Sequence, residues 1–193
     1  MSGRVLSVNV GRAVEIEIDG RRVISAIGKK AVASPHAVSR SGLAGDEQAD
    51  LSVHGGPSKP IYAYPSEHYP FWQTVRAQAR AAAWNDKLAP GALGENLTLA
   101  GLLENQVWIG DLLRFPGCIL AVSEPRFPCF KLNAALGFEQ AAALMQANGW
   151  CGFYLAIREP GTLQEGDPFE LIAGPREVGI PELFRARTGR RAA

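Results

Sequence analysis

The stretch QVWIGDLLRFPGCILAVS, residues 106–123, contains three short apolar runs that are separated by glycine and proline residues. The runs cover residues 106–109, 112–115 and 118–123, and each of them is a strand candidate. Glycine (21 residues) and proline (13 residues) are spread along the whole chain in the same way, so we expect many short strands joined by turns. The sequence therefore predicts a mainly β protein.

The clearest hairpin lies near the N-terminus. Residues 13–18 alternate between apolar and polar side chains, Asp19-Gly20 follows, and residues 21–27 provide the second strand. An Asp-Gly pair supplies the positive φ angles that a tight hairpin turn needs. Further strand candidates lie at residues 4–8, 61–64, 96–99, 152–157 and 169–172.

Two helices are expected between the strands. One begins at Ser66, a suitable N-cap, has Pro70 in its first turn and continues to about Trp84. The other covers residues 138–147 and ends at an Asn-Gly pair, a good C-cap. Many short strands with helices in the long connections predict a closed or nearly closed β-barrel with helices at its rim, with a β-sandwich as the alternative.

Length, charge and hydropathy exclude several classes of protein. A chain of 193 residues with 47% hydrophobic residues fits one globular domain. A net charge of +1 argues against a nucleic-acid binder. No apolar run is long enough for a membrane span, and the N-terminal region has acidic residues where a signal peptide would have its apolar core. We therefore expect a cytoplasmic protein that binds neither nucleic acid nor membranes.

The C-terminal residues differ from the rest in composition. Four arginines occur between residues 185 and 191. We expect a solvated, partly frayed tail there. The alternative is an arm that faces an anion or a partner protein. The sequence thus divides into a single barrel domain at residues 1–175 and a short basic tail at residues 176–193.

One of the three cysteines has unusual neighbours. An odd number of cysteines without zinc or redox spacing predicts free thiols, and Cys118 and Cys151, in or beside apolar strands, are expected to be buried. Cys129 instead lies in a loop that two prolines stiffen, with Arg126 and Lys131 on either side of it. Flanking cations favour a thiolate, which can act as a nucleophile or bind a soft metal. We interpret Cys129 as a functional residue.

A second candidate segment, residues 42–57, contains His54 beside Gly55 and Gly56. Glycines let backbone N–H groups approach a ligand closely, and such N–H arrays bind anions, phosphate above all. His54 can donate to an anion or transfer a proton, or it can be a turn histidine bonded to its own loop. Asp46 lies in the same segment and is also a candidate for ligand binding. The alternative is that it simply caps a turn.

Asn96 follows a glycine-hinged loop at residues 91–94. Its amide carries both donor and acceptor groups, which suits the edge of a heterocycle, and the alternative is an amide bonded to the backbone. The sequence has no G-x-G-x-x-G dinucleotide fingerprint, no phosphate-binding P-loop and no G-x-S-x-G nucleophile elbow.

Four blocks of the sequence, taken in order, together resemble the MOSC family: GLAGDEQADLSVHGGPSKPIYAYPSEHYPFW, PGALGENLTLAGLLENQVWIGDLLRF, AVSEPRFPCFKL and GWCGFYLAIREPGTLQEGDPFEL. The likeness covers about residues 1–175. It is closest to the YiiM-type branch of molybdenum-cofactor proteins that are linked to N-hydroxylaminopurine resistance. The resemblance implies a MOSC β-barrel in which Cys129 ligates molybdenum or carries sulfur. Family members often carry a small helical extension after the barrel, and the corresponding region here is short and arginine-rich.

These residues and this resemblance together suggest an enzyme that uses the molybdenum cofactor (Mo-molybdopterin) to reduce N-hydroxylated compounds to amines. Cys129 is the expected molybdenum ligand and catalytic residue. Arg126 is expected to retain the cofactor more strongly than Arg187 in the tail. The other candidates for cofactor binding are Lys131, His54, Gly55, Gly56, Asn96, Gln48 and Asp46.

Two other functions remain open at the level of the sequence. In one, Cys129 forms a persulfide and delivers sulfur to a metal centre. In the other, the protein binds or stores the cofactor without turnover. If the protein is an enzyme, it needs an electron donor. The sequence has no dinucleotide fingerprint and fewer than the four cysteines that an iron–sulfur cluster needs, so we expect a separate flavin-containing reductase to donate the electrons. The sequence is compatible with an oligomer.

Overall fold

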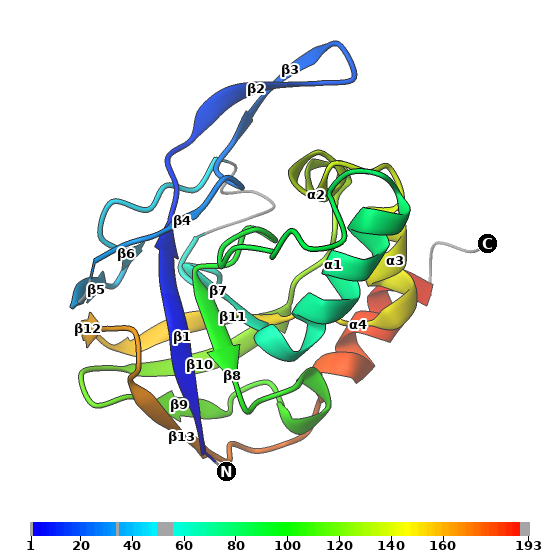
Figure 1. The fold of residues 1–193 in the computed structure, drawn as a ribbon. Helices are drawn as coiled ribbons and strands as arrows, with labels where there is room; N and C mark the ends of the chain where they lie inside the picture. The colour runs from blue at the N-terminus through cyan, green and yellow to red at the C-terminus, as the bar shows by residue number, and fades with distance from the viewer. Residues whose placement is uncertain (1, 34, 50–55, 190–193) are drawn as a thin grey trace.

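Seven strands close into a β-barrel in the computed structural model, which describes residues 2–33, 35–49 and 56–189 (Figure 1). The circle is completed where the first strand of the chain pairs with the last, with Ser2 opposite Glu170. The predicted mainly β fold with a closed barrel is confirmed. In order around the barrel the strands are β13 (Pro168–Ile172), β9 (Leu112–Arg114), β10 (Ile119–Pro125), β11 (Phe153–Glu159), β7 (Ile61–Pro65), β8 (Leu97–Ala100) and β1 (Ser2–Val10).

One pair of barrel strands, β7 and β8, is parallel, whereas the other barrel pairs are antiparallel. Parallel neighbours need a crossover connection. The chain provides it with the 3₁₀ turn Ser66–His68 and helix α1 (Tyr69–Gln78), which has Pro70 in its first turn as expected. Trp72 of α1 is fully buried in the same apolar cluster as Val5 of the barrel, so the crossover helix also covers part of the barrel wall.

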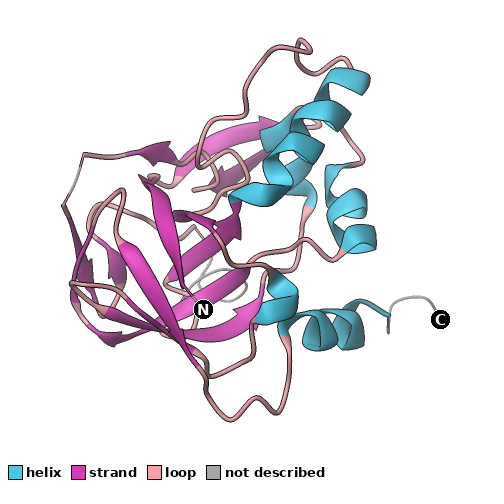
Figure 2. Cartoon of the chain, turned by 60° about the horizontal axis from the view of Figure 1, so that its bottom comes forward, coloured by secondary structure: helices cyan, strands magenta, loops and turns pink. Residues whose placement is uncertain are grey.

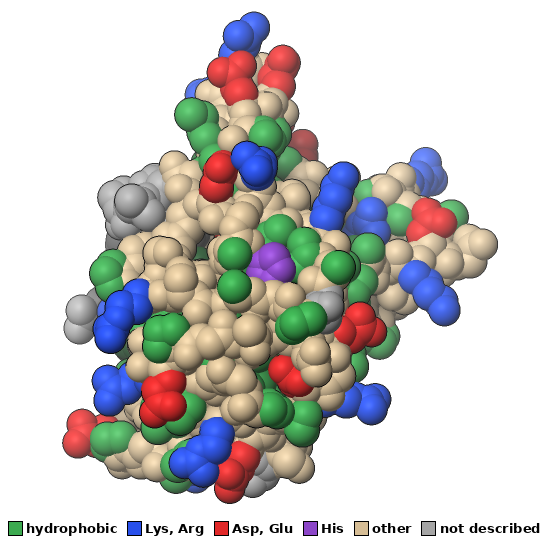
Figure 3. All heavy atoms as spheres, turned by 90° about the vertical axis from the view of Figure 1, so that its left-hand side faces the viewer, with side chains coloured by type: hydrophobic (Ala, Val, Ile, Leu, Met, Phe, Trp, Pro, Cys, Tyr) green, Lys and Arg blue, Asp and Glu red, His purple; other side chains and the backbone are tan. Residues whose placement is uncertain are grey.

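The hairpin expected at residues 13–27 forms a separate two-stranded sheet of β2 (Val14–Ile18) and β3 (Arg21–Ser25). Asp19 and Gly20 join its strands with φ angles of 51° and 72°, as the Asp-Gly pair predicts. The hairpin projects beyond one end of the barrel, and Figure 3 shows it standing above the rest of that face. The remaining short strands are β4 (Lys30–Ala31), which pairs with β1, and the three-stranded sheet of β12 (Gly161–Leu163), β5 (His36–Ser39) and β6 (Gly42–Leu43).

The helices gather along one side of the barrel (Figure 2). Besides α1 they are α2 (Phe130–Leu136), α3 (Ala141–Asn148) and α4 (Ile180–Thr188). The helices expected at residues 66–84 and 138–147 correspond to α1 and α3, and Gly149 caps α3 with a φ of 70°. Helix α1 ends earlier than expected because Arg80 adopts a φ of 60°, which no α-helix accommodates. Helix α2 was not expected from the sequence.

The strand expected at residues 106–109 does not form. Gln106 ends a short 3₁₀ turn, and Trp108 makes a single bridge to Gly179 instead of joining a ladder. The side chain of Asp111 accepts a hydrogen bond from the Trp108 N–H at 3.1 Å. This local bond holds the backbone in a turn and replaces the strand partner.

The frayed tail expected after residue 175 is wrong for the part that α4 occupies. Ile180 and Phe184, four residues apart, are buried, and the Phe184 ring stacks on Phe127 with centroids 5.5 Å apart. Arg187 forms an ion pair with Glu124 at 3.4 Å. The spacing of Ile180 and Phe184, at positions i and i+4, is typical of one face of a helix. The arginines around them interrupt the apolar pattern, so the sequence analysis did not predict this helix. The domain division at residue 175 stays a prediction.

A bilayer-spanning helix is absent from the described residues, since none there is both long and apolar enough.

Replacing Phe184 with alanine tests whether α4 is an integral part of the fold. Phe184 is 1% exposed, so we expect Phe184→Ala to lower the free energy of unfolding by ~3–5 kcal/mol through the cavity that it leaves. Urea denaturation measures the change. The exposed neighbour Arg185 is the control, because Arg185→Ala should change stability by less than ~0.5 kcal/mol. Equal stability of the two variants would mean that α4 is a detached tail.

Candidate functional site

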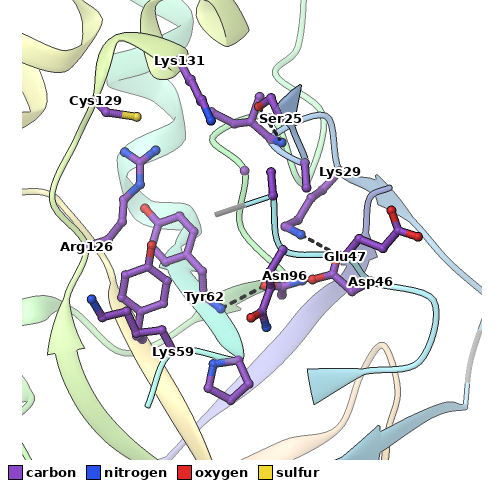
Figure 4. Close-up of a pocket in the computed structure, with 17 residues that line it drawn as sticks. Ser25, Lys29, Asp46, Glu47, Lys59, Tyr62, Asn96, Arg126, Cys129 and Lys131 are labelled. Carbon is purple, nitrogen blue, oxygen red and sulfur yellow. Dashed lines mark hydrogen bonds and ion pairs between the residues drawn. The ribbon is translucent and has the colours of Figure 1, made fainter. Parts of the chain in front are cut away.

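A pocket of about 630 Å³, its open mouth included, lies where the hairpin, the barrel and the start of α2 meet (Figure 4). The pocket brings together segments that are far apart in the sequence. Its lining residues are Ser25, Ala26, Ile27, Lys29, Asp46, Glu47, Gln48, Ala49, Lys59, Pro60, Tyr62, Gly94, Asn96, Arg126, Cys129, Lys131 and Tyr154.

Cys129 lies in this pocket, half-buried, directly before the first residue of α2. Its extended backbone, with φ −133° and ψ 172°, follows the proline-stiffened turn, and its sulfur lies beside the guanidinium group of Arg126 (Figure 4). Cys118 and Cys151 are 4% and 0% exposed, so the expectation that they are buried is confirmed. Burial raises the pKa of Cys118 to about 12 and also raises the pKa of Cys151. Cys129 is therefore the cysteine that is available for chemistry.

Arg126 is a buried cation that makes no ion pair with any described carboxylate. Its Nη1 donates to the Met145 sulfur at 3.3 Å, and its guanidinium lies 5.4 Å from the centre of the Tyr62 ring. Burial opposes the charge, but the polar groups of Tyr62, Tyr154 and Cys129 outweigh burial and raise the pKa of Arg126. A buried charge is costly unless it is paired. An anionic ligand in the pocket would supply the missing partner.

Two further cations reach the pocket from different elements. Lys131 extends from α2 to the hairpin, where its Nζ donates to the Ile24 carbonyl at 2.8 Å. Lys59 pairs with Glu124 at 3.3 Å and lies 6.0 Å from the centre of the Tyr154 ring. Lys59 was not among the residues expected from the sequence, because no local motif distinguishes it from any other surface lysine.

Asp46 and Asn96 form a buried network with Lys29 at the other side of the pocket. Asp46 Oδ1 accepts bonds from Lys29 Nζ at 2.5 Å and from the Gly11 N–H at 2.8 Å, while its Oδ2 accepts from the Asn96 amide at 2.9 Å. Asn96 Oδ1 accepts from the Tyr62 N–H at 3.0 Å. Burial lowers the pKa of Lys29 although Asp46 acts in the opposite direction.

These bonds agree with the structural alternative for Asn96, an amide bonded to the backbone, whereas Asp46 bonds to Gly11, Lys29 and Asn96 and not to its own turn. Both Asn96 amide hydrogens are used within the protein, one by Asp46 and one by the Asn9 carbonyl at 3.2 Å. The two residues line the pocket all the same, and their contact with a cofactor stays a prediction. Lys29 is a pocket residue that the sequence analysis missed, since only the fold brings it to Asp46.

The glycine-rich segment is described only in part. Gly56 has a φ of 80°, and its N–H donates to Gln48 Oε1 at 2.9 Å, which ties the two ends of the segment together. Gln48 lines the pocket. His54 and Gly55 lie outside the described residues, so their roles in anion binding stay predictions.

The site combines one accessible thiol with an excess of positive charge. Four cations line it, Lys29, Lys59, Arg126 and Lys131, against the carboxylates of Asp46 and Glu47. Within residues 2–33, 35–49 and 56–189, no group of three or more His, Cys, Asp or Glu side chains could hold a metal ion. A metal at Cys129 would therefore take its other ligands from a bound cofactor, and the cations would bind that cofactor's anionic groups.

Comparison with known proteins gives the family of this barrel and pocket. The MOSC domain pattern matches residues 50–170, which include Cys129. The chain belongs to the MOSC domain family. This MOSC protein is 39% identical over 183 residues to the uncharacterized protein YflK of Bacillus subtilis (strain 168), a match that covers 95% of the chain and 79% of YflK. It is also 39% identical over 159 residues to protein YiiM of Escherichia coli (strain K12), with 82% and 68% covered.

A third relative is a much longer protein. The chain is 33% identical over 190 residues to a protein named reductase from Gibberella moniliformis (strain M3125 / FGSC 7600), and the match covers 96% of the chain but 33% of that reductase. Among solved structures, YiiM from Geobacillus stearothermophilus superposes with a TM-score of 0.75 at 30% identity, covering 99% of this chain and 86% of that one. YiiM from Escherichia coli gives 0.71 at 29% identity, covering 96% and 76%. The fold of this MOSC protein is YiiM-like.

Alkylation of the folded protein tests the assignment of Cys129 as the accessible thiol. We expect iodoacetamide to modify Cys129 in the native protein, and Cys118 and Cys151 only after denaturation, because a buried thiol is inert. Peptide mass spectrometry before and after adding urea identifies the modified residues. Native-state labelling of Cys151 in preference to Cys129 would contradict the described pocket.

Proposed function

We propose that this MOSC protein binds the molybdenum cofactor in its pocket and reduces N-hydroxylated compounds to the corresponding amines. The proposal is carried by one observation, the accessible sulfur of Cys129 beside the buried, carboxylate-free guanidinium of Arg126. The thiol suits a soft metal, and the guanidinium suits an anionic group of the cofactor that carries this metal. The relatives named YiiM and reductase support the proposal at the level of the family.

The pocket fits such a cofactor in charge and in donor type. Cys129 offers one thiol ligand for the metal. Among the described residues no cluster of His, Cys, Asp or Glu side chains adds further protein ligands, so the remaining metal ligands can come from the cofactor. Arg126 and Lys131, with Lys59 nearby, provide donors for a phosphate, and charge-assisted hydrogen bonds of this kind are among the stronger ones. When bound, the cofactor would supply a metal that exchanges two electrons with the substrate as its N–O bond breaks.

The overall reaction fixes what the protein must provide besides the metal. Each N-hydroxyl group takes up two electrons and two protons, and it yields one amine and one water molecule. The chain's own residues bind and orient: Arg126 holds the anionic end of the cofactor, while Cys129 fixes its position. Tyr154 lines the same pocket, and burial raises its pKa to about 12 although Arg126 acts in the opposite direction. Its hydroxyl is therefore neutral at physiological pH and serves as a hydrogen-bonding group.

The hairpin contributes by covering one side of the pocket. Residues 25–27 at its base line the cavity, and Lys131 bonds to the Ile24 carbonyl. A cover of this kind excludes water from the reacting groups, which strengthens the electrostatic interactions inside the site.

We propose that the electrons come from a separate flavin-containing reductase. The sequence contains no dinucleotide fingerprint, and its three cysteines are too few for an iron–sulfur relay. The related reductase of Gibberella moniliformis has two thirds of its length outside the match to this chain. That additional length supports an electron path that involves more protein than one MOSC domain.

Exchanging the single accessible thiol tests the proposed chemistry. We expect Cys129→Ala to abolish reduction of a hydroxylamine substrate by the cofactor-loaded protein, while the unfolding temperature stays within about 2 °C because the side chain is only half-buried. Turnover is measured with a chemical reductant that bypasses any partner.

The same assay separates the alternatives. Wild-type protein that retains the cofactor without turnover would point to a storage module. A persulfide on Cys129 in mass spectra, with no cofactor bound, would point to a sulfur carrier. Full activity of Cys129→Ala would contradict both the metal-ligand and the persulfide roles of Cys129.

The second test concerns the electron donor. The purified chain, loaded with cofactor, should fail to oxidise NADPH in the presence of a hydroxylamine substrate, because its sequence lacks a dinucleotide fingerprint. Addition of a flavin-containing reductase should start NADPH consumption, which absorbance at 340 nm follows on the order of minutes at the ~10 s⁻¹ turnover usual for enzymes. NADPH-dependent turnover by the chain alone would remove the need for a partner.

A further inference from the structure

Glu124 is a carboxylate close to Arg126 that does not pair with it. It precedes Arg126 by two residues, and across the ladder of β10 and β11 it lies opposite Tyr154. The charges of Arg126 and Glu124 act in opposite directions on the pKa of Tyr154, which Arg126 lowers and Glu124 raises. The carboxylate and the guanidinium thus meet the same tyrosine. A carboxylate two residues from a buried cation that has no described carboxylate partner is attracted to it in a medium of low dielectric constant.

Two cations hold Glu124 instead. Its Oε2 atom lies 3.3 Å from Lys59 Nζ and 3.4 Å from Arg187 Nη1. Lys59 comes from the segment before β7, and Arg187 comes from the last turn of α4. The Glu124 side chain is 15% exposed and that of Lys59 21%, so this pair is partly shielded from water, whereas the Arg187 side chain is 55% exposed.

Helix α4 fixes Arg187 in this place through the residue that follows Arg126. Phe127 stacks on Phe184 with ring planes 8° apart, and the Arg187 guanidinium lies 5.5 Å from the centre of the Phe127 ring. Arg187 therefore contacts the residues on both sides of Arg126 along the chain, Glu124 and Phe127, without touching the pocket itself.

We propose that Arg187 is a positioning residue which, together with Lys59, holds Glu124 away from Arg126 and so keeps the buried guanidinium available to an oxyanion in the pocket. Without Arg187, the carboxylate competes with the ligand for the same charge. The inference rests on the proposed function only for the identity of the oxyanion, which would be the phosphate of the cofactor. The anion site itself is independent of any turnover.

Binding of inorganic phosphate tests this role in the full-length chain, purified from cells that make no molybdenum cofactor. Isothermal titration calorimetry at fixed pH and ionic strength gives the dissociation constants. Arg187→Ala should bind phosphate roughly 3- to 10-fold more weakly, the effect of one carboxylate charge released beside the site. Arg185→Ala removes the same charge from the same helix at an exposed residue that forms no ion pair with Glu124, and it should stay within about twofold of the wild type. Arg126→Ala should abolish binding.

Two more variants separate the charge of Arg187 from its packing. Arg187→Lys keeps a cation for Glu124 but loses the planar contact with Phe127, and it should bind phosphate like the wild type. In the double variant Glu124→Gln/Arg187→Ala the competing charge is gone, so affinity should return to within about twofold of the wild type. A purely structural role for Arg187 predicts no such recovery.

The inference is overturned if Arg187→Ala and Arg185→Ala bind equally well, if the double variant is as weak as Arg187→Ala, or if the wild type does not bind phosphate. Should Arg187→Ala fail to fold, Glu124→Gln alone decides: binding at least as tight as the wild type supports the role, and weaker binding refutes it. Absence of hydroxylamine reduction, with the phosphate results as expected, would refute the proposed function and leave the role of Arg187 standing.

Discussion

The site depends on the positive charge of Arg126, which is buried without a carboxylate partner among the described residues. Burying it costs free energy, and the structure offsets part of that cost with the Met145 sulfur and the Tyr62 ring. Glu124, two residues before Arg126, pairs with Lys59 and Arg187 instead. This arrangement supports the proposal that the pocket binds an anion next to Arg126.

The barrel makes this arrangement possible because its closure sets the positions of segments that are distant in sequence. The pairing of β1 with β13 closes the wall, and the network of Asp46 with Gly11 and Asn96 ties the base of the hairpin to the barrel. The hairpin, the cysteine loop and the cations then face one cavity (Figure 4). Helix α4 adds a second support behind the cysteine loop through the stacked rings of Phe127 and Phe184.

Local signals predicted the elements in which each residue's own neighbours decide the conformation. The Asp19-Gly20 turn, the apolar strands and the glycine cap of α3 are of this kind, because φ preferences and alternation act over a few residues. The predictions failed where a specific side-chain contact, near in the chain in one case and distant in the other, decided the outcome. Residues 106–109 lose their strand to the Asp111 side chain, and α4 is stabilised by Phe127, 57 positions before Phe184 in the numbering.

By itself the sequence determined the barrel class, the singular position of Cys129 between its prolines and cations, and the likeness to the MOSC family. The tertiary structure decided which charges are neutralised. It pairs Lys29 with Asp46, gives Glu124 two cations and leaves Arg126 without a described carboxylate, and none of these facts follows from spacing along the chain. The physical reason is that the strength of a charge pair depends on distance and burial, which only the closed barrel sets.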